Sequence, residues 1–107
     1  MAERAIVVGA GVGGLSAAIS LAADGYDVVV VEAAPTLGGK AGTLVLDGVE
    51  VDTGPSVLTM PDVFDELLRL AGTSLADEVA LVSPDPAFRY VWPDGTAVDL
   101  HVSIERT

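Results

Sequence analysis

The chain has 107 residues, which is enough for one domain at most. Its formal net charge of −11 argues against nucleic acids and anionic membrane surfaces as electrostatic partners. Because it has no cysteine and only one histidine, His101, disulfides, thiolate chemistry and histidine-based metal clusters are excluded.

Residues 5–23 carry no charge and have the hydropathy of a signal peptide or a membrane span. However, this stretch is rich in glycine, which is unfavourable in a lipid-embedded helix, and a strand-like run follows it directly. We therefore expect a cytoplasmic protein whose association with a membrane, if any, is peripheral.

The first third of the chain has the pattern of a βαβ unit. Ala5–Gly9 is a short β-branched apolar run, typical of a strand that is buried on both faces. Gly13–Asp24 has apolar residues at helical spacing before Gly25, and Asp27–Glu32 is a second apolar run. Two strands joined by one helix predict a right-handed parallel βαβ unit, and so an α/β, Rossmann-like fold.

The rest of the chain is predicted to form hairpins and helices. Asp47-Gly48 is a hairpin turn signal, and Pro61 favours the start of a helix. The expected elements in chain order are a loop at Ala33–Ala41, strands at Thr43–Leu46 and Val49–Asp52, a helix from Met60–Asp62 to Gly72, one or two helical turns at Ser74–Val79, and strands at Phe88–Trp92 and Thr96–Val102.

Residues 9–14, Gly-Ala-Gly-Val-Gly-Gly, fit the G-x-G-x-x-G pattern of a dinucleotide-binding turn. Gly9 permits the tight turn out of the strand, Gly11 lets a pyrophosphate approach the backbone, and Gly14 lets the helix lie close to the strand. The helix then begins at the phosphates, with its free N–H groups and positive dipole end toward them. We therefore expect Val12 and Gly13 to contact the dinucleotide together with these three glycines.

Glu32 closes the second strand at the distance downstream of Gly14 that the pattern requires. A carboxylate there can accept hydrogen bonds from both ribose hydroxyls of an adenosine, and it would repel a 2′-phosphate, which disfavours NADP. The βαβ unit alone leaves both NAD and FAD open. The alternative is an ordinary glycine-rich turn in which Glu32 is a solvated charge at the end of a strand.

Two later segments, Leu37–Thr43 and Val51–Ser56, resemble the flavin amine oxidase superfamily. In that group a Gly-Gly-Arg/Lys element follows the acidic residue, and an Asp-x-Gly segment follows a short hairpin. The resemblance implies FAD as the cofactor. It also implies that Gly39 and Lys40 line the pyrophosphate and ribitol of FAD. By the same resemblance, Gly54 and Pro55 would run near the flavin ring.

The chemistry of Gly39 and Lys40 fits this assignment, because paired glycines let a backbone approach a ligand and a cation offsets the charge of a diphosphate. Lys40 stands where many relatives have arginine, so it would act as a point charge and not as a fork. The alternative is a Gly-Gly turn followed by a solvent-exposed lysine.

A longer match covers most of the chain. Residues 51–61, 64, 67–68, 84–92 and 94–96 resemble the bacterial and archaeal phytoene desaturases, with Val51 where an aromatic residue is usual. These enzymes and related carotenoid desaturases and isomerases use FAD to remove hydride from long polyenes or to rearrange them. The resemblance therefore implies an FAD-dependent oxidoreductase that acts on a hydrophobic, carotenoid-like small molecule. Since flavin hydride transfer depends on positioning and exclusion of water, we expect no catalytic acid or base and no metal site here.

Members of that family are several times longer, and a segment near their C-terminus completes the FAD domain. We therefore expect residues 1–107 to be the N-terminal part of a discontinuous FAD-binding domain, with a βαβ core at 5–32 and an extension of hairpins and a helix at 33–107. Such an incomplete domain leaves a sheet edge and helix faces uncovered, and alone it is expected to be inactive. Two alternatives stay open: a flavin amine oxidase or protoporphyrinogen oxidase relative, and an inactive truncated gene product.

Several other polar and aromatic residues are given structural roles. His101 is expected to be a surface or half-buried histidine without a catalytic role. Three acids are expected in the first turn of a helix, where they suit its dipole: Asp62, Asp65 and Glu66. Three aromatic residues are expected to pack on one face of a hairpin: Phe88, Tyr90 and Trp92.

Overall fold

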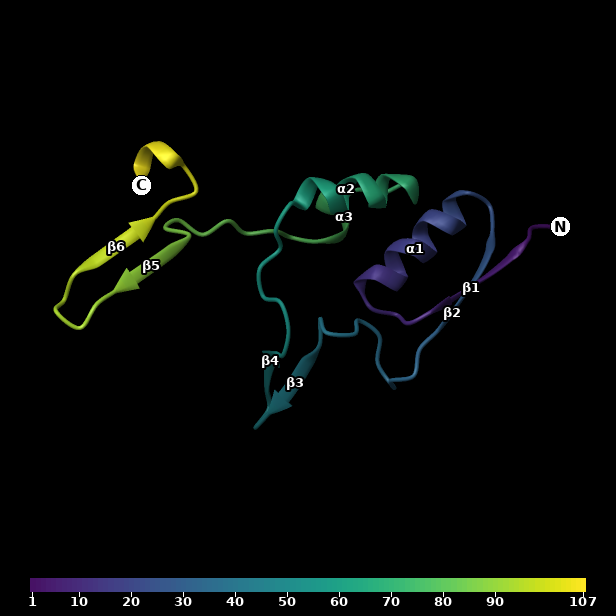
Figure 1. Ribbon diagram of the computed structural model, residues 1–107, viewed down its shortest axis with the longest axis horizontal. Coiled ribbons are helices and arrows are strands. Elements are labelled where there is room, and N and C mark those ends of the chain that lie inside the picture. Colours follow the sequence, from purple (N-terminus) through teal and green to yellow (C-terminus); the bar gives the residue numbers. More distant parts are fainter.

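The computed structural model describes residues 1–107 (Figure 1). Strands β1 (Arg4–Val8) and β2 (Asp27–Val31) pair in parallel, and α1 (Val12–Ala23) connects them. The predicted βαβ unit is confirmed, and each of its boundaries lies within one residue of the expected position.

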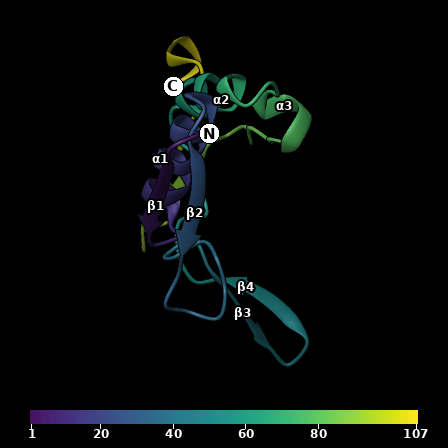
Figure 2. The same ribbon diagram turned by 90° about the vertical axis from the view of Figure 1, so that its right-hand side faces the viewer.

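The first hairpin consists of β3 (Thr43–Leu46) and β4 (Val49–Asp52), with the bounds that the sequence predicts. Asp47 and Gly48 between them have left-handed backbone, with φ of 49° and 80°. Two successive left-handed residues match the twist of a two-residue hairpin turn, which explains the Asp-Gly pair. The hairpin projects away from the βαβ unit in both views (Figures 1 and 2).

The second predicted hairpin consists of β5 (Phe88–Val91) and β6 (Ala97–Leu100), and it is followed by a single 3₁₀ turn, η1 (Ile104–Arg106). Across it, the Arg89 guanidinium forms two hydrogen bonds to the Asp99 carboxylate, at 2.6 and 2.7 Å. This hairpin lies at the end of the molecule that is farthest from the βαβ unit (Figure 1).

The predicted central helix is α2 (Pro61–Leu70), which begins at a proline, and the short α3 (Leu75–Glu78) follows it. Helix α2 packs beside α1 in both views (Figures 1 and 2). Of the three acids expected in its first turn, only Asp62 lies there.

Asp65 lies in the second turn of α2, as Glu66 does, so the dipole role expected for these two residues is wrong. The Asp65 carboxylate accepts a hydrogen bond from the Leu75 N–H at 2.8 Å and pairs with Arg69 at 2.7 Å. These two donors, the Leu75 N–H foremost, lower the pKa of Asp65. Asp65 therefore fixes the start of α3 against α2.

The chain is elongated, with extents of 67 × 38 × 19 Å. Its radius of gyration is 18.8 Å, against about 13 Å for a compact domain of this length. Only Ala10 and Leu75 are buried. The three two-stranded sheets do not join into one sheet, so most apolar side chains stay partly exposed.

The prediction that β1 and β2 are buried on both faces is wrong. Their side chains alternate, because α1 covers one face of this sheet and no other element covers the second. The half-buried residues are Ala5, Val7, Val28 and Val30, and the exposed ones are Ile6, Val8, Val29 and Val31. The expected incomplete domain is thereby confirmed, whereas the uncovered sheet face was not expected.

Candidate dinucleotide-binding site

The glycine turn at residues 9–14 connects β1 to α1. Gly9 leaves the strand with a φ of 99°, a left-handed conformation that favours glycine, and its N–H donates to the Val31 carbonyl at 2.7 Å. A Cβ atom on Gly14 would lie 1.9 Å from the Gly9 carbonyl oxygen, which no structure tolerates. The absence of a side chain at Gly14 therefore lets α1 approach β1 as closely as the sequence pattern predicts.

The N-terminus of α1 presents free backbone donors. Gly11 is the N-cap residue, no side chain caps the helix, and its first turn holds no acidic residue. The first helical hydrogen bond runs from the Leu15 N–H to the Gly11 carbonyl at 2.9 Å. The N–H groups of Val12, Gly13 and Gly14 precede it and have no acceptor within the helix, which is the arrangement that binds phosphate oxygens.

A second glycine loop lies directly against this turn. The Gly38 N–H donates to the Ala10 carbonyl at 2.8 Å, and Gly38 forms a parallel β-bridge with Gly11. Gly39 is left-handed, with a φ of 60°, and a Cβ atom on it would lie 3.1 Å from the Gly11 Cα. Two backbones thus come together in a cradle with no side chain between them, and Lys40 directly follows Gly39 in the chain.

Glu32 is half-buried beside the glycine turn. One carboxylate oxygen accepts from the Ala10 N–H at 2.6 Å, and the other accepts from the Ala34 N–H at 3.0 Å. The Ala34 N–H and then the Ala10 N–H hold the pKa of Glu32 below its ordinary value, so the group is ionised at neutral pH. Each oxygen keeps a further lone pair with which it can accept a hydroxyl.

The Gly54–Pro55 segment passes against the backbone of Lys40. A Cβ atom on Gly54 would lie 1.8 Å from the Lys40 carbonyl oxygen, and the Thr53 N–H donates to the Gly42 carbonyl at 2.9 Å. The Lys40 ammonium forms no ion pair within the chain. The predicted site residues therefore form one continuous region: Gly9, Gly11, Val12, Gly13, Gly14, Glu32, Gly39, Lys40, Gly54 and Pro55.

Sequence reasoning missed Ala10, which is fully buried at the centre of this region. Its N–H donates to Glu32 and its carbonyl accepts from Gly38, so it connects the acidic residue to the second glycine loop. The only signal for this in the sequence is a small residue between two glycines. The backbone of Ala34 was missed in the same way.

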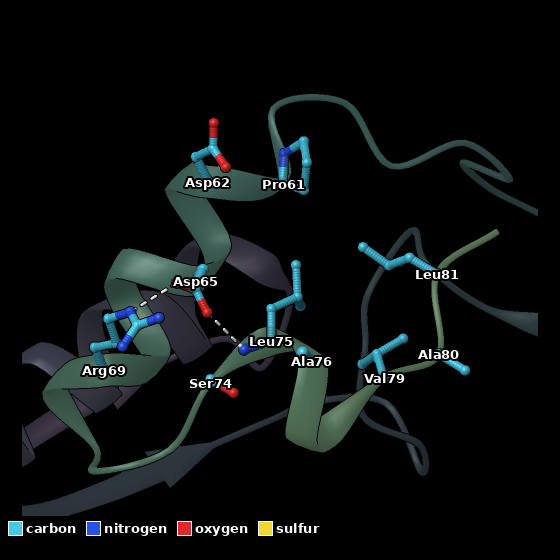
Figure 3. Close-up of a pocket in the computed structure, with 10 residues that line it drawn as sticks. All are labelled: Pro61, Asp62, Asp65, Arg69, Ser74, Leu75, Ala76, Val79, Ala80 and Leu81. Atoms are coloured by element: carbon cyan, nitrogen blue, oxygen red, sulfur yellow. Dashed lines mark hydrogen bonds and ion pairs between the residues drawn. The ribbon is translucent and has the colours of Figure 1, made fainter. Parts of the chain in front are cut away.

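Other clusters do not add to this site. A pocket of about 530 Å³ between α2 and α3 is lined by ten residues, among them Asp65, whose carboxylate is already used by Leu75 and Arg69 (Figure 3).

At the C-terminal hairpin, His101 Nδ1 lies 2.6 Å from the Asp85 carboxylate, which also pairs with Arg106. These two donors, His101 foremost, lower the pKa of Asp85.

The structure has neither a helix that could cross a membrane nor a side-chain cluster that could hold a metal ion. None of the helices combines the length and the apolar character that crossing a bilayer requires. No three His, Cys, Asp or Glu side chains lie together in an arrangement that could hold a metal ion.

Comparison with known families decides the class of ligand. Residues 7–73 match the family described as "NAD(P)-binding Rossmann-like domain". The chain belongs to this family. The matched part of this Rossmann-like domain includes the glycine turn, Glu32, the second glycine loop and α2, so a dinucleotide is the ligand class that the family implies.

The predicted resemblance to the carotenoid desaturases is also confirmed. The Rossmann-like domain is 46% identical over 98 residues to a 4,4′-diapolycopene oxygenase of a Methylomonas species, with 92% of this chain aligned. It is 42% identical over 99 residues to a phytoene dehydrogenase of Streptomyces griseus, with the same coverage. It is 45% identical over 100 residues to a hydroxyneurosporene desaturase of Rhodobacter capsulatus, with 94% aligned.

A crystal structure of a Pyrococcus furiosus protein has a similar fold, with a TM-score of 0.64 and 32% identity over 92% of this chain. This chain covers 24% of that protein and 20% of each of the three relatives above. The Rossmann-like domain therefore spans about a fifth to a quarter of the length of the proteins that it matches.

Proposed function

We propose that this Rossmann-like domain binds the ADP half of FAD and serves an FAD-dependent oxidoreductase that acts on a carotenoid-like polyene. The observation that carries the proposal is the contact between the two glycine loops. It presents the N-terminus of α1, the Glu32 carboxylate and Lys40 around one cradle that a side chain would fill.

The adenosine end of the ligand fits the Glu32 side of the cradle. Its carboxylate is ionised and held in place by two backbone N–H groups, so it is ready to accept the two ribose hydroxyls. The same charge disfavours a 2′-phosphate. A pyrophosphate at the N-terminus of α1 would meet the free N–H groups of Val12, Gly13 and Gly14.

FAD is favoured over NAD by what lies beyond the βαβ unit. Lys40, next to Gly39 in the chain, offers a cation without an ion-pair partner, and Gly54 lies against the Lys40 backbone. Both NAD and FAD carry the diphosphate that Lys40 would meet, so the choice of FAD rests on the resemblance of residues 37–43 and 51–56 to flavin-dependent oxidoreductases. The relatives named for polyene oxidation support the same choice.

Bound FAD would supply the hydride acceptor for such a reaction. The residues of this chain would bind and orient it: the α1 N-terminus and Lys40 neutralise the diphosphate, Glu32 fixes the ribose, and the Gly54–Pro55 backbone flanks the flavin. No acid or base of this chain is assigned a step. We infer a cytoplasmic location, with any membrane association peripheral and driven by the apolar substrate.

The test is equilibrium dialysis of the chain against ADP, FAD, NAD and NADP, with circular dichroism to verify secondary structure. We expect binding of ADP, tighter binding of FAD, and the weakest binding for NADP. Binding of NAD in preference to FAD would overturn the assignment of FAD. A chain with the expected helix content that binds no ADP would overturn the proposed site itself.

A further inference from the structure

Three Asp-Gly pairs lie in exposed turns of this chain: Asp24–Gly25 after α1, Asp47–Gly48 between β3 and β4, and Asp94–Gly95 between β5 and β6. In each pair the glycine is left-handed, with φ of 94°, 80° and 86°. Because glycine has no side chain, its backbone nitrogen is open to the carboxyl group of the preceding aspartate. The three pairs differ in which of these two groups are held by hydrogen bonds.

At Asp94–Gly95 both groups are held. The Asp94 carboxylate accepts from the Thr96 N–H at 2.9 Å, and the Gly95 N–H donates to the Trp92 carbonyl at 3.0 Å. Hydrogen bonds from Thr96, its backbone N–H foremost, hold the pKa of Asp94 below its ordinary value. The carboxylate is therefore fixed on Thr96, and the Gly95 nitrogen is occupied.

At Asp24–Gly25 only the nitrogen is held. The Gly25 N–H donates to the Ala22 carbonyl at 3.0 Å, in the turn that ends α1. The Asp24 carboxylate accepts no hydrogen bond and forms no ion pair within the chain. One hydrogen bond therefore protects this pair.

At Asp47–Gly48 neither group is held. The Asp47 carboxylate has no hydrogen-bond or ion-pair partner, and the Gly48 N–H has no acceptor. A Cβ atom on Gly48 would meet nothing within 4 Å, so the turn is open there. The Asp47 side chain is free to change rotamer, and no bond has to break before its carboxyl group approaches the Gly48 nitrogen.

We infer that Asp47–Gly48 is a modification site, at which the aspartate isomerises through a cyclic imide without an enzyme. The Gly48 nitrogen attacks Cγ of the protonated Asp47 carboxyl group. A C–N bond forms, the C–OH bond breaks, and the hydroxyl leaves as water with the proton of the nitrogen. Water then opens the imide ring. Addition at the main-chain carbonyl carbon of Asp47 leaves the chain connected through the side-chain carbonyl, which is an isoaspartate, and no oxidant or reductant takes part.

Isomerisation changes the hairpin at its turn. An isoaspartate adds one methylene group to the main chain and leaves a free α-carboxylate, so the formal charge stays the same. The longer turn no longer matches the twist of the two strands, and the Leu46–Val49 pair beside it loosens. The base of the hairpin keeps the bond from the Thr53 N–H to the Gly42 carbonyl. The new α-carboxylate is the group that isoaspartyl carboxyl methyltransferases modify, which defines the chemistry of a partner.

Heavy-oxygen water measures the reaction, because each opening of the imide ring adds one solvent oxygen to the aspartyl residue. The chain is incubated in this water at neutral pH, in native buffer and in urea, with circular dichroism to verify the fold in native buffer. Trypsin then separates the three pairs, since its cleavage after lysine and arginine gives peptides 5–40, 41–69 and 90–106. Fragmentation in the mass spectrometer assigns the label to the residue.

In native buffer we expect the label to enter Asp47 fastest, Asp24 more slowly and Asp94 slowest. Two hydrogen bonds distinguish Asp94–Gly95 from Asp47–Gly48, so the two labelling rates should differ by about tenfold or more. In urea the three rates should converge, because the folded structure no longer protects any pair. Labelling of Asp47 no faster than that of Asp94 in native buffer, or the same ranking in urea, would overturn the inference.

Asp47→Glu is the matched variant, because it keeps the charge but would have to close a larger and slower ring. Labelling at position 47 should fall to background in this variant, while labelling of Asp24 and Asp94 should not change. An isoaspartyl carboxyl methyltransferase with labelled S-adenosylmethionine should methylate the aged wild-type chain and spare the aged variant. Equal methylation of both would overturn the assignment to Asp47. Because no ligand takes part, none of these results depends on the proposed cofactor site.

Discussion

The Glu32 carboxylate accepts a hydrogen bond from the Ala10 backbone N–H at 2.6 Å. Ala10 in turn accepts from the second glycine loop through its carbonyl. The acid that closes β2 is therefore coupled through one buried residue to the loop that carries Lys40. This coupling makes Glu32 both a candidate ligand of ribose and a structural support of the cradle.

Replacing Glu32 tests the ribose contact. In Glu32→Gln the amide group has only one oxygen to offer the two backbone donors, and the charge is lost. A hydrogen bond to a charged group contributes about 1.5–3 kcal/mol, so affinity for ADP should fall by about tenfold or more. Discrimination between ADP and its 2′-phosphorylated analogue should also shrink. Titration calorimetry measures both affinities, and Glu50→Gln, at an exposed site on β4, is the control. An equal loss of ADP affinity in both variants would contradict a ribose contact at Glu32.

The lowered pKa of Glu32 predicts how the cradle responds to pH. Because the folded-state pKa is below the unfolded value of about 4.3, the ionised carboxylate contributes stability that is fully present above pH 4.3. This contribution is lost as pH falls through the lowered folded-state pKa. Near neutral pH the contribution of Glu32 to stability should therefore not change with pH, and it should decline only in acid.

Urea unfolding at several pH values measures this dependence. Other carboxyls with lowered pKa values, Asp65, Asp85 and Asp99 among them, titrate in the same acid range. The informative quantity is therefore the difference between the wild type and Glu32→Gln. That difference should be constant from neutral pH to about 5 and should shrink at lower pH. If the difference in unfolding free energy between the two proteins grew as the pH fell, the predicted role of the Glu32 carboxylate would be contradicted.

The elements of this chain were predictable where the signal is local. The glycine spacing at 9–14, the apolar runs on either side and the Asp47–Gly48 turn each act over a few residues, and each is found where the sequence predicts it. Strand burial was not predictable in this way. Whether Val8 and Val31 are covered depends on elements beyond α1, and none covers them in this structure.

The site was predictable in part for the same reason. A motif identifies glycines whose missing side chain allows a close approach, but it does not say which backbone segments make that approach. The contact of Gly39 with Gly11, the role of Ala10 and the use of Asp65 by the Leu75 N–H all join segments that are separate in the sequence. Such pairings follow from tertiary structure and have no local signature.

Gly14 offers a test of the close approach between α1 and β1. A Cβ atom there would collide with the Gly9 carbonyl oxygen at 1.9 Å, so Gly14→Ala must push the helix away from the strand. Such overpacking costs about 1–3 kcal/mol of unfolding free energy. Gly13→Ala is the matched control, because a Cβ atom there meets nothing within 4 Å, and alanine should stabilise the helix by about 0.5–1 kcal/mol. Equal effects of the two substitutions in urea unfolding would argue against the tight packing.

Lys40 offers a test of the diphosphate contact. Its ammonium has no partner in the chain, so removing it in Lys40→Ala should leave the fold unchanged and weaken FAD by about threefold to tenfold. Adenosine, which has no phosphate, should bind equally to both proteins. Arg4→Ala removes the same charge from an exposed pair with Asp27 at the far end of β1, so it controls for net charge.

Salt and a conservative variant complete this test. Since the contact is electrostatic, FAD affinity of the wild type should fall more steeply with ionic strength than that of Lys40→Ala. Lys40→Arg should restore the affinity, because a guanidinium can donate two hydrogen bonds to a phosphate. If Lys40→Ala instead weakened adenosine as much as FAD, or if Arg4→Ala had the same effect, Lys40 would not be a contact of the diphosphate. The cradle would then hold its ligand through the α1 N-terminus and Glu32 alone.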